Sequence, residues 1–309
     1  MTRSLTRLAT ALAVALVLGT PVLSGAADDQ KTDDQKKKGG AHADAAGSPA
    51  PAATATDEDD AVLRLAEPDF SLIALPTSLR LPKFKSQFRV THRFARPISC
   101  DSCTEGFFAS GLGIDDGANI GLEYRVGIVP NGQIGIHRTS RDKTIELFGQ
   151  YGLTRQGAKV PVETAALAAL DVAFVGVTDA PSHYSPVLGL IVTRLIGDVA
   201  ALHVEPIWVN NTNPLPSAVV DHNSTFMVGL GARVRIRPTV YVVAELTPRV
   251  AGFRPGANQG GFAIEKRAGG HMFQLNFSTA LGTAFSQIAR GGEPDNDWHM
   301  GFNITRKFF

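Results

Sequence analysis

Two cysteines, Cys100 and Cys103, come closest to a known chemical motif, because only two residues separate them. Such a pair can form a short exchangeable disulfide, take part in redox chemistry or bind a metal. A covalent haem site needs His directly after the second cysteine, where this chain has Thr104. A zinc site needs two more ligands nearby, and His92 is the single histidine close in sequence. In an oxidising compartment we expect a structural disulfide, with a redox or metal role and free thiols as alternatives.

The eight histidines form no H-E-x-x-H or H-x-H metal motif in a region expected to fold. His203 and Glu205 share one face of an expected strand, where they can bind a metal or poise a base. The favoured interpretation is simpler, with both side chains in a wetted hydrogen-bond network. The chain has no G-x-S-x-G elbow and no recognisable cluster of Ser, His and acid residues. We therefore predict no enzymatic activity, no metal and no cofactor.

Most other polar residues alternate with apolar ones along extended segments. Within residues 119–129, for example, every second residue from Ile120 to Ile128 is apolar, which predicts a strand with one apolar face. The charged residues expected on the opposite, lumen-facing sides of such strands are Arg89, Arg93, Glu123, Arg125, Glu146, His203, Glu205, Arg233, Arg235, Arg237 and Glu245. These residues either line a narrow water-filled path with a mild anion preference or form ion pairs that fill and close the barrel.

About twelve segments of this kind follow residue 85. They lie near residues 87–95, 119–129, 133–140, 143–155, 167–178, 186–196, 199–209, 223–237, 239–249, 261–267, 271–279 and 298–308. Short and long links mostly alternate between them, which predicts an all-β fold, an antiparallel transmembrane β-barrel of about 12 strands. The fifth and sixth segments are apolar on both faces, so their phase stays open.

The N-terminal part of the chain divides into three regions before the barrel. Residues 1–26 combine two arginines, an apolar run and small residues, as a secretory signal peptide does. Residues 27–60 are rich in Ala, Asp and Lys, and predict a disordered spacer. Prolines interrupt residues 61–84, which either cross or plug something or lead into the barrel domain at 85–309. The formal net charge of +1 gives no sign of nucleic-acid binding.

A water-soluble β-sandwich is the main competing fold, since alternating strands and turn signals fit it too. Two features favour the membrane barrel. Segments of ten or more residues suit a tilted crossing of a hydrocarbon layer roughly 30 Å thick better than a soluble sheet. The apolar faces are also free of gaps and contain Tyr and Phe, as expected for contact with lipid.

Four stretches of the chain resemble an uncharacterised family of bacterial barrel proteins, known only as a domain of unknown function. They are LPTSLRLPKFKSQFRVTHRF, GLGIDDGANIGLEYRVGI, GTAFSQIARGG and the ending DWHMGFNITRKFF. The resemblance extends from about residue 75 to the end of the chain. It implies an outer-membrane-type barrel and gives no reaction, substrate or cofactor.

We therefore expect an exported protein of the outer membrane of a Gram-negative bacterium, acting as a small passive channel or as a binding or scaffold barrel. A soluble periplasmic binding protein and a membrane-embedded lipid-modifying enzyme are the alternatives. The expected partners are outer-membrane lipid and the barrel-assembly machinery. Phe309 is expected to be the assembly signal, while Phe302, Ile304 and Phe308 face lipid.

Overall fold

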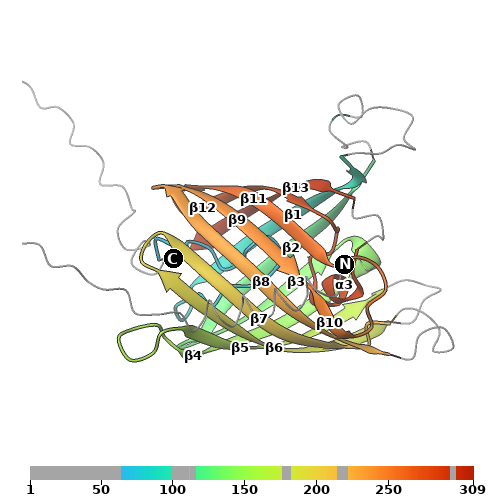
Figure 1. Ribbon diagram of the computed structural model, residues 1–309, viewed down its shortest axis with the longest axis horizontal. Coiled ribbons are helices and arrows are strands. Elements are labelled where there is room, and N and C mark those ends of the chain that lie inside the picture. The colour runs from blue at the N-terminus through green and yellow to red at the C-terminus, as the bar shows by residue number, and fades with distance from the viewer. Residues whose placement is uncertain (1–63, 99–110, 112–115, 176–181, 214–221, 293–296) are drawn as a thin grey trace, which may run out of the picture.

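The computed structural model describes residues 64–98, 111, 116–175, 182–213, 222–292 and 297–309, and these form a closed antiparallel β-barrel (Figure 1). The elements are β1 (Ser86–Pro97), β2 (Ala118–Val129), β3 (Gly132–Thr139), η1 (Arg141–Lys143), β4 (Ile145–Thr154), β5 (Glu163–Ala173), β6 (His183–Ile196), β7 (Ala200–Asn210), β8 (Ser224–Arg237), β9 (Val240–Thr247), β10 (Arg249–Gly252), β11 (Gln259–Ala268), β12 (His271–Ser278), α3 (Phe285–Arg290) and β13 (His299–Phe308). Pro248 alone separates β9 from β10, and both pair with β8. The wall therefore has 12 strands, which confirms the predicted fold class.

Each wall strand pairs with its neighbours in sequence, and the ring closes between β1 and β13, where Phe88 lies opposite Arg306. Period-two alternation places one side of every strand toward the interior and the other outward. Among the described residues, no helix is both long enough and apolar enough to span a membrane, a finding that does not bear on β-strands.

The two ends of the barrel differ. At one end, here called the turn end, β2–β3, β6–β7, β8–β9 and β11–β12 are joined by short turns, and β13 finishes there. The opposite end, the loop end, carries the longer connections. The link between β3 and β4 is short although it lies at the loop end, as the sequence predicts, and it contains the single turn η1.

The fifth and sixth strands differ most from the segments predicted for them. β5 begins four residues earlier than predicted and ends at Ala173, and β6 begins at His183. In the middle of these strands the interior positions are apolar, and Leu167 and Ile191 are buried there. The polar interior residues Glu163, Asp171, Ser185 and Thr193 lie toward the strand ends. Alternation could not set the phase of these strands because the middle of each is apolar on both faces.

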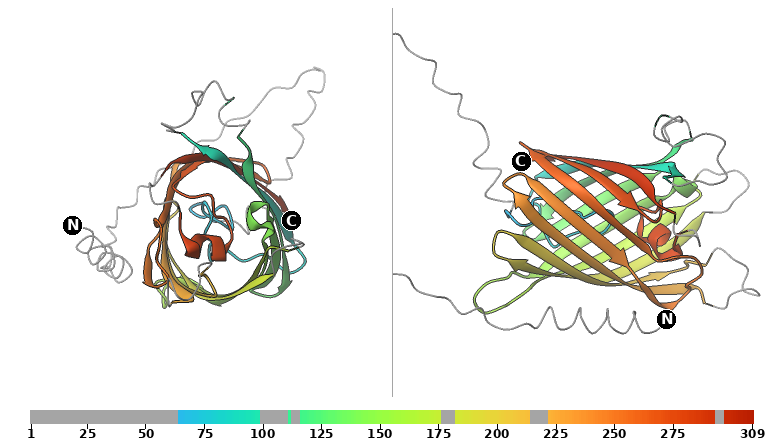
Figure 2. Two further views of the ribbon diagram at one scale, coloured as in Figure 1. Left: turned by 90° about the vertical axis from the view of Figure 1, so that its right-hand side faces the viewer. Right: turned by 45° about the horizontal axis from the view of Figure 1, so that its top comes forward.

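Two segments of the chain occupy the interior (Figure 2). Residues 64–82, here called the lumen hairpin, enter from the turn end, reverse direction near Ile73 and return to β1. The amide of Leu72 donates to the carbonyl of Leu75 (2.8 Å), and that of Thr77 to Phe70 (2.9 Å), as in a tight hairpin. Helix α3 lies inside the loop end, so both mouths contain protein.

Candidate functional site

The tip of the lumen hairpin is held by one carboxylate of the barrel wall. Oε2 of Glu245, on β9, accepts hydrogen bonds from the amides of Ile73, Ala74 and Leu75 at 3.0, 2.9 and 3.0 Å. Glu245 is 5% exposed, so these bonds form away from bulk water. Hydrogen bonds to a charged acceptor are about twice as strong as neutral ones. Glu245 therefore fixes the hairpin at its deepest point.

The carbonyl oxygens of the tip face the opposite wall, which supplies donors. The carbonyl of Ile73 accepts from Arg89 (2.7 Å), Arg93 (3.1 Å) and Asn303 (3.1 Å). These three residues lie on β1 and β13, where the ring closes. The tip thus meets an acceptor on one side and cationic donors on the other, which specifies its orientation as well as its depth.

Arg233 on β8 connects the hairpin to a buried ion pair. Its guanidinium contacts both carboxylate oxygens of Glu265 on β11, at 2.8 and 3.0 Å. The same group donates to the carbonyl of Ser71 at 2.6 Å. Arg233 and Glu265 are both fully buried. A bidentate pair of this kind is rigid, and it holds the descending arm of the hairpin against the wall.

Further ion pairs fix the hairpin where it enters the barrel. Glu163, the first residue of β5, contacts Arg64 at 2.6 Å and Arg80 at 3.4 Å, one on each arm. On the opposite side, Asp69 lies 3.5 Å from Nζ of Lys307. Burial raises the pKa of Asp69, but the charges of Lys307 and nearby arginines outweigh burial and hold it below its usual value. Asp69 is therefore ionised at neutral pH.

The last residue of the chain contacts the hairpin. Phe309 packs against a buried cluster formed by Phe70, Leu79 and Leu81 at the turn end. The neighbouring Phe308 points outward and is 49% exposed, as predicted for a lipid-facing residue. A role for Phe309 in assembly stays a prediction, and its position gives it a second task in covering the hairpin.

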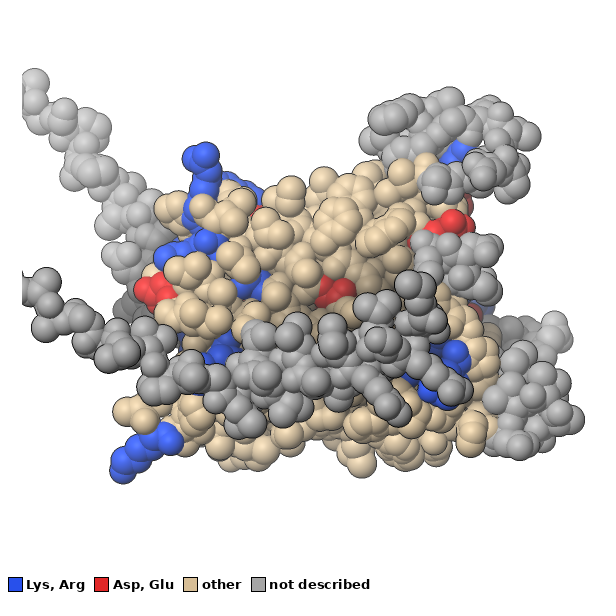
Figure 3. All heavy atoms as spheres, in the orientation of Figure 1, with Lys and Arg blue, Asp and Glu red and all other residues tan. Residues whose placement is uncertain are grey.

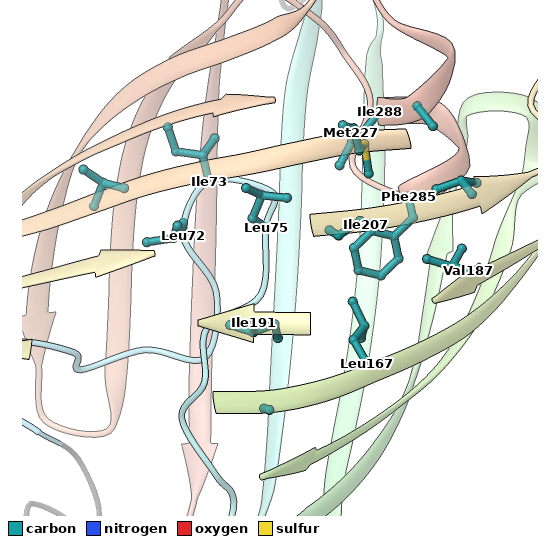
Figure 4. Close-up of a cluster of buried hydrophobic side chains, with 14 of the residues drawn as sticks. Leu72, Ile73, Leu75, Leu167, Val187, Ile191, Ile207, Met227, Phe285 and Ile288 are labelled. Carbon is teal, nitrogen blue, oxygen red and sulfur yellow. The ribbon is translucent and has the colours of Figure 1, made fainter. Parts of the chain in front are cut away.

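Apolar packing joins the hairpin to helix α3 in the middle of the barrel (Figure 4). Leu72, Ile73 and Leu75 of the hairpin belong to the same buried cluster as Phe285 and Ile288 of α3. The wall residues of that cluster are Ala165, Leu167, Val187, Ile191, Ile207, Val209, Met227, Val243 and Ala263. Most of these lie on β5–β8, which explains why the middles of β5 and β6 are apolar on both faces.

Glycines in the wall leave room for the hairpin. A Cβ atom at Gly231 would lie 2.2 Å from a methyl carbon of Leu72, and one at Gly229 would lie 2.6 Å from Leu75. At the turn end, a Cβ at Gly127 would lie 2.1 Å from the carbonyl oxygen of Pro82. Contacts this short require the neighbour to move, so the wall is shaped to the hairpin as well as bonded to it.

Helix α3 is anchored by acids of the loop-end wall. Glu146 accepts from the amide of Phe285 at 2.9 Å, and Asp171 accepts from the amide of Ser286 at 2.6 Å. These are free amides of the first helical turn, which favours negative charge. At the other end of the helix, Arg290 contacts Asp142 at 3.1 Å. Helix α3 is therefore held inside the loop end at both of its termini.

The structure brings nine of the eleven predicted lumen residues together in the interior. Nine are buried there: Arg89, Arg93, Glu123, Arg125, Glu146, His203, Glu205, Arg233 and Glu245. Arg235 is partly exposed and Arg237 is exposed, because β8 extends past the interior at the turn end. Cys100 and Cys103 lie outside the described residues.

Within this group, the structure shows an ion pair and the surroundings of His203, which the sequence pairs with Glu205 as a candidate metal site. Arg125 contacts Glu123 at 2.6 Å. His203 contacts Thr193 through Nδ1 (3.0 Å), and its Nε2 lies 3.7 Å from Glu67 of the hairpin. The described residues contain no group of three His, Cys, Asp or Glu side chains arranged to hold a metal ion.

Sequence reasoning did not select several residues that hold the hairpin. Gln133 donates to the carbonyl of Leu79 (3.2 Å) and accepts from the amide of Leu81 (3.1 Å), while Asn303 and Glu265 make the contacts described above. Their positions along the strands gave a usable signal. Residues an even number apart on a strand share a face, and each of these three lies at such a spacing from a predicted lumen residue or from a small residue that faces the lumen.

The seating of the lumen hairpin inside the barrel, here called closure, depends on pH through Glu67. Burial, aided by the charge of Glu163, raises the pKa of Glu67 to about 8. In a released hairpin the carboxyl returns to about 4.3. Because the pKa of Glu67 is higher when the hairpin is seated in the lumen, Glu67 fully stabilises the seated state below the pKa of the released state. This stabilisation is lost as the pH rises through the pKa of the seated state. The charged and titratable groups that face Glu67 are Arg64, Glu163, His203, Glu205 and Arg233.

We therefore predict that protection of the hairpin amides from hydrogen exchange falls between about pH 5 and pH 8. Each unit in that window changes the free energy of closure by at most about 1.4 kcal/mol. The Glu67→Gln variant should remove the trend and protect the hairpin better above pH 8. Exchange is measured by mass spectrometry on residues 70–77 and corrected for intrinsic rates. An unchanged slope in Glu67→Gln would assign the titration to another group.

The fold and its interior define a class of protein, a closed β-barrel with an outward apolar surface and a lumen filled by its own chain. The sequence belongs to the family described as Membrane bound beta barrel domain (DUF5777), whose model matches residues 69–308. This confirms the predicted family and sets aside the soluble β-sandwich. The matched range takes in most of the lumen hairpin as well as the wall.

Solved structures with a related shape include a NanC porin, with 8% identity, a TM-score of 0.44 and coverage of 72% of this chain and 99% of that one. Outer membrane phospholipase A from Escherichia coli has 10% identity, a TM-score of 0.39 and coverage of 72% and 90%. These values are too low to inform the role of this chain. Among curated proteins, no sequence matches it.

Proposed function

We propose that this protein is a closed barrel of the bacterial outer membrane that serves as a binding or anchoring scaffold, with no catalytic role. One observation carries the proposal: the wall residues best suited to line a pore are bonded to the lumen hairpin. Arg89, Arg93 and Glu245 all contact the backbone of residues 73–75. Such groups are not free to coordinate a passing solute, so the passive-channel interpretation applies to a state with the hairpin withdrawn.

Planar-bilayer recording of the purified full-length protein tests the proposal. We expect no discrete conductance steps across voltage at neutral pH. A Gly231→Leu variant, whose side chain occupies the place of Leu72, should conduct because its hairpin cannot seat. Heat-modifiable mobility in electrophoresis checks that both proteins are folded barrels.

Two outcomes would contradict the proposal or its physical basis, which is closure of the lumen by the hairpin. Steady conductance steps in the wild type would establish an open passive channel. A silent Gly231→Leu barrel in which hydrogen exchange shows the hairpin released would mean that α3 and the wall side chains close the lumen without it. A Gly149→Leu variant is the matched control, since a Cβ at Gly149 meets nothing closer than 3.9 Å.

A further inference from the structure

A group of basic and aromatic residues lies on the outer surface at the turn end, on the neighbouring strands β1, β13, β12 and β11 and just before β1. Arg306 on β13 lies opposite Phe88 on β1 and His271 on β12. Lys266 on β11 lies opposite Phe273 on β12. Phe84 precedes β1, and Lys83 lies over its ring at 4.7 Å. We call this set, with Phe308, the interface patch: Lys83, Phe84, Phe88, Lys266, His271, Phe273, Arg306 and Phe308.

The patch alternates cations with rings that are open to the surroundings. Arg306 lies 5.8 Å from the ring centroid of Phe308 and hydrogen-bonds Nδ1 of His271 at 3.1 Å. That bond leaves other guanidinium donors of Arg306 available, since the group has five. Phe273 and Phe308 are 44% and 49% exposed. Rings at this level of a barrel wall suit the boundary between hydrocarbon and headgroups.

Phe84 is held outward at a cost. Its φ of 65° lies in the left-handed region, and its side chain is 78% exposed. This backbone conformation destabilises a non-glycine residue by on the order of 1 kcal/mol or more. A phenylalanine ring exposed to water contributes no stabilisation that would offset this strain. The amide of Phe84 is fixed by the carbonyl of Gly127 at 2.7 Å, so the conformation is built into the wall. Transfer of this exposed ring from water to lipid would be favourable and would offset the strain.

The patch is unbalanced in charge. The described turns at this end, residues 130–131, 155–162, 197–199, 238–239 and 269–270, contain one acid, Asp198. It joins β6 to β7, on the far side of the ring from β13. Glu265, next to Lys266, is fully buried and paired with Arg233. In the view of Figure 3, blue side chains lie at the turn end, with red atoms beside them, next to a mostly tan wall.

We propose that the interface patch binds the phosphate headgroup of an anionic phospholipid, with Arg306 and Lys266 contacting the headgroup and the phenylalanines contacting its acyl chains. The two basic residues lie on strands separated by one strand and are offset by two residues along it, so their backbones are about 12 Å apart. Long side chains reach a shared phosphate over that span. The proposal rests on the membrane setting of the proposed function and is independent of whether the lumen is closed.

Native mass spectrometry of the full-length protein in detergent, titrated with phosphatidylglycerol or phosphatidylcholine, tests the site. We expect tighter binding of phosphatidylglycerol. An Arg306→Gln/Lys266→Gln variant should lose about 25-fold in affinity for it, at about fivefold for each basic residue near a membrane surface, with little change for phosphatidylcholine. Arg254→Gln, which removes an exposed arginine at the loop end, is the matched control and should bind as the wild type does.

Several results would overturn the proposal. Equal binding of the two lipids, or equal losses in Arg254→Gln and the double variant, would show that the patch does not select headgroups. Displacement of phosphatidylglycerol by equimolar glycerol phosphate would indicate a soluble anion site. Stronger lipid binding after conversion of the acidic residues 57–60 to amides would show that the chain's own charges occupy the patch. Conductance in planar bilayers is measured in a separate experiment. The closed-lumen proposal and the lipid-site proposal can therefore be contradicted independently of each other.

Discussion

Replacing Glu245 with Ala is expected to release the tip of the lumen hairpin and turn a silent barrel into a conducting one. The change removes the shared acceptor of three buried amides, those of residues 73–75. Each unsatisfied buried donor costs about 1–3 kcal/mol. It also removes a carboxylate whose charge favours the charged form of Arg93. The closed state should therefore lose several kcal/mol relative to the released state.

Two measurements check this result together. Hydrogen exchange at residues 73–75 should accelerate at least 100-fold, and bilayer recordings should show steps that are absent in the wild type. Glu245→Gln is the matched control, since its amide oxygen keeps one acceptor in place and should give a smaller effect. If Glu245→Ala keeps wild-type exchange rates, the carboxylate does not hold the hairpin and the apolar contacts are sufficient.

Strand β8 illustrates why the wall of the barrel was predictable from sequence. One of its faces meets the exterior through Phe226 and Val234, and the opposite face carries Arg233. Different surroundings on the two faces impose period-two alternation on the sequence. The same reasoning placed the lumen arginines on β1 and the outward Phe308 on β13.

Strands β5 and β6 show where the same reasoning loses its signal. Their interior residues Leu167 and Ile191 pack on Leu75, Phe285 and their neighbours. With lipid-facing residues on one side and an apolar core on the other, both faces become apolar in the middle of each strand. Alternation then carries no phase, and β5 begins at Glu163, four residues before the predicted segment.

The lumen hairpin could be noticed but not placed from its sequence. Its prolines, including Pro68 and Pro76, rule out a regular strand, and its fold depends on partners far along the chain. Glu245 is 172 residues from Ile73, and Asn303 is 230 residues away. No local period encodes such contacts. The nearest sequence clue is on β8, where Gly229 and Gly231 occupy alternate interior positions and make a hollow that something must fill.

Replacing Arg233 with Met should destabilise the whole barrel more than any surface substitution. The change leaves Glu265 buried with its charge uncompensated, and breaking a buried pair by removing one partner costs about 3–5 kcal/mol. Gln274, which donates to Glu265 at 2.7 Å, offsets only part of the loss. The free energy of unfolding is measured by urea titration in detergent, followed by the mobility of folded and unfolded forms.

A double substitution separates the pair from the rest of the site. Arg233→Met/Glu265→Gln removes both charges together, so it should recover much of the loss, because a neutral amide costs far less to bury than an unpaired carboxylate. Arg237→Met, on the same strand but exposed at the turn end, should change stability by less than about 0.5 kcal/mol. Equal losses in the single and double variants would mean that Arg233 stabilises the barrel through the carbonyl of Ser71 and the hairpin. The ion pair would then be incidental, and the hairpin itself would be a structural part of the folded barrel.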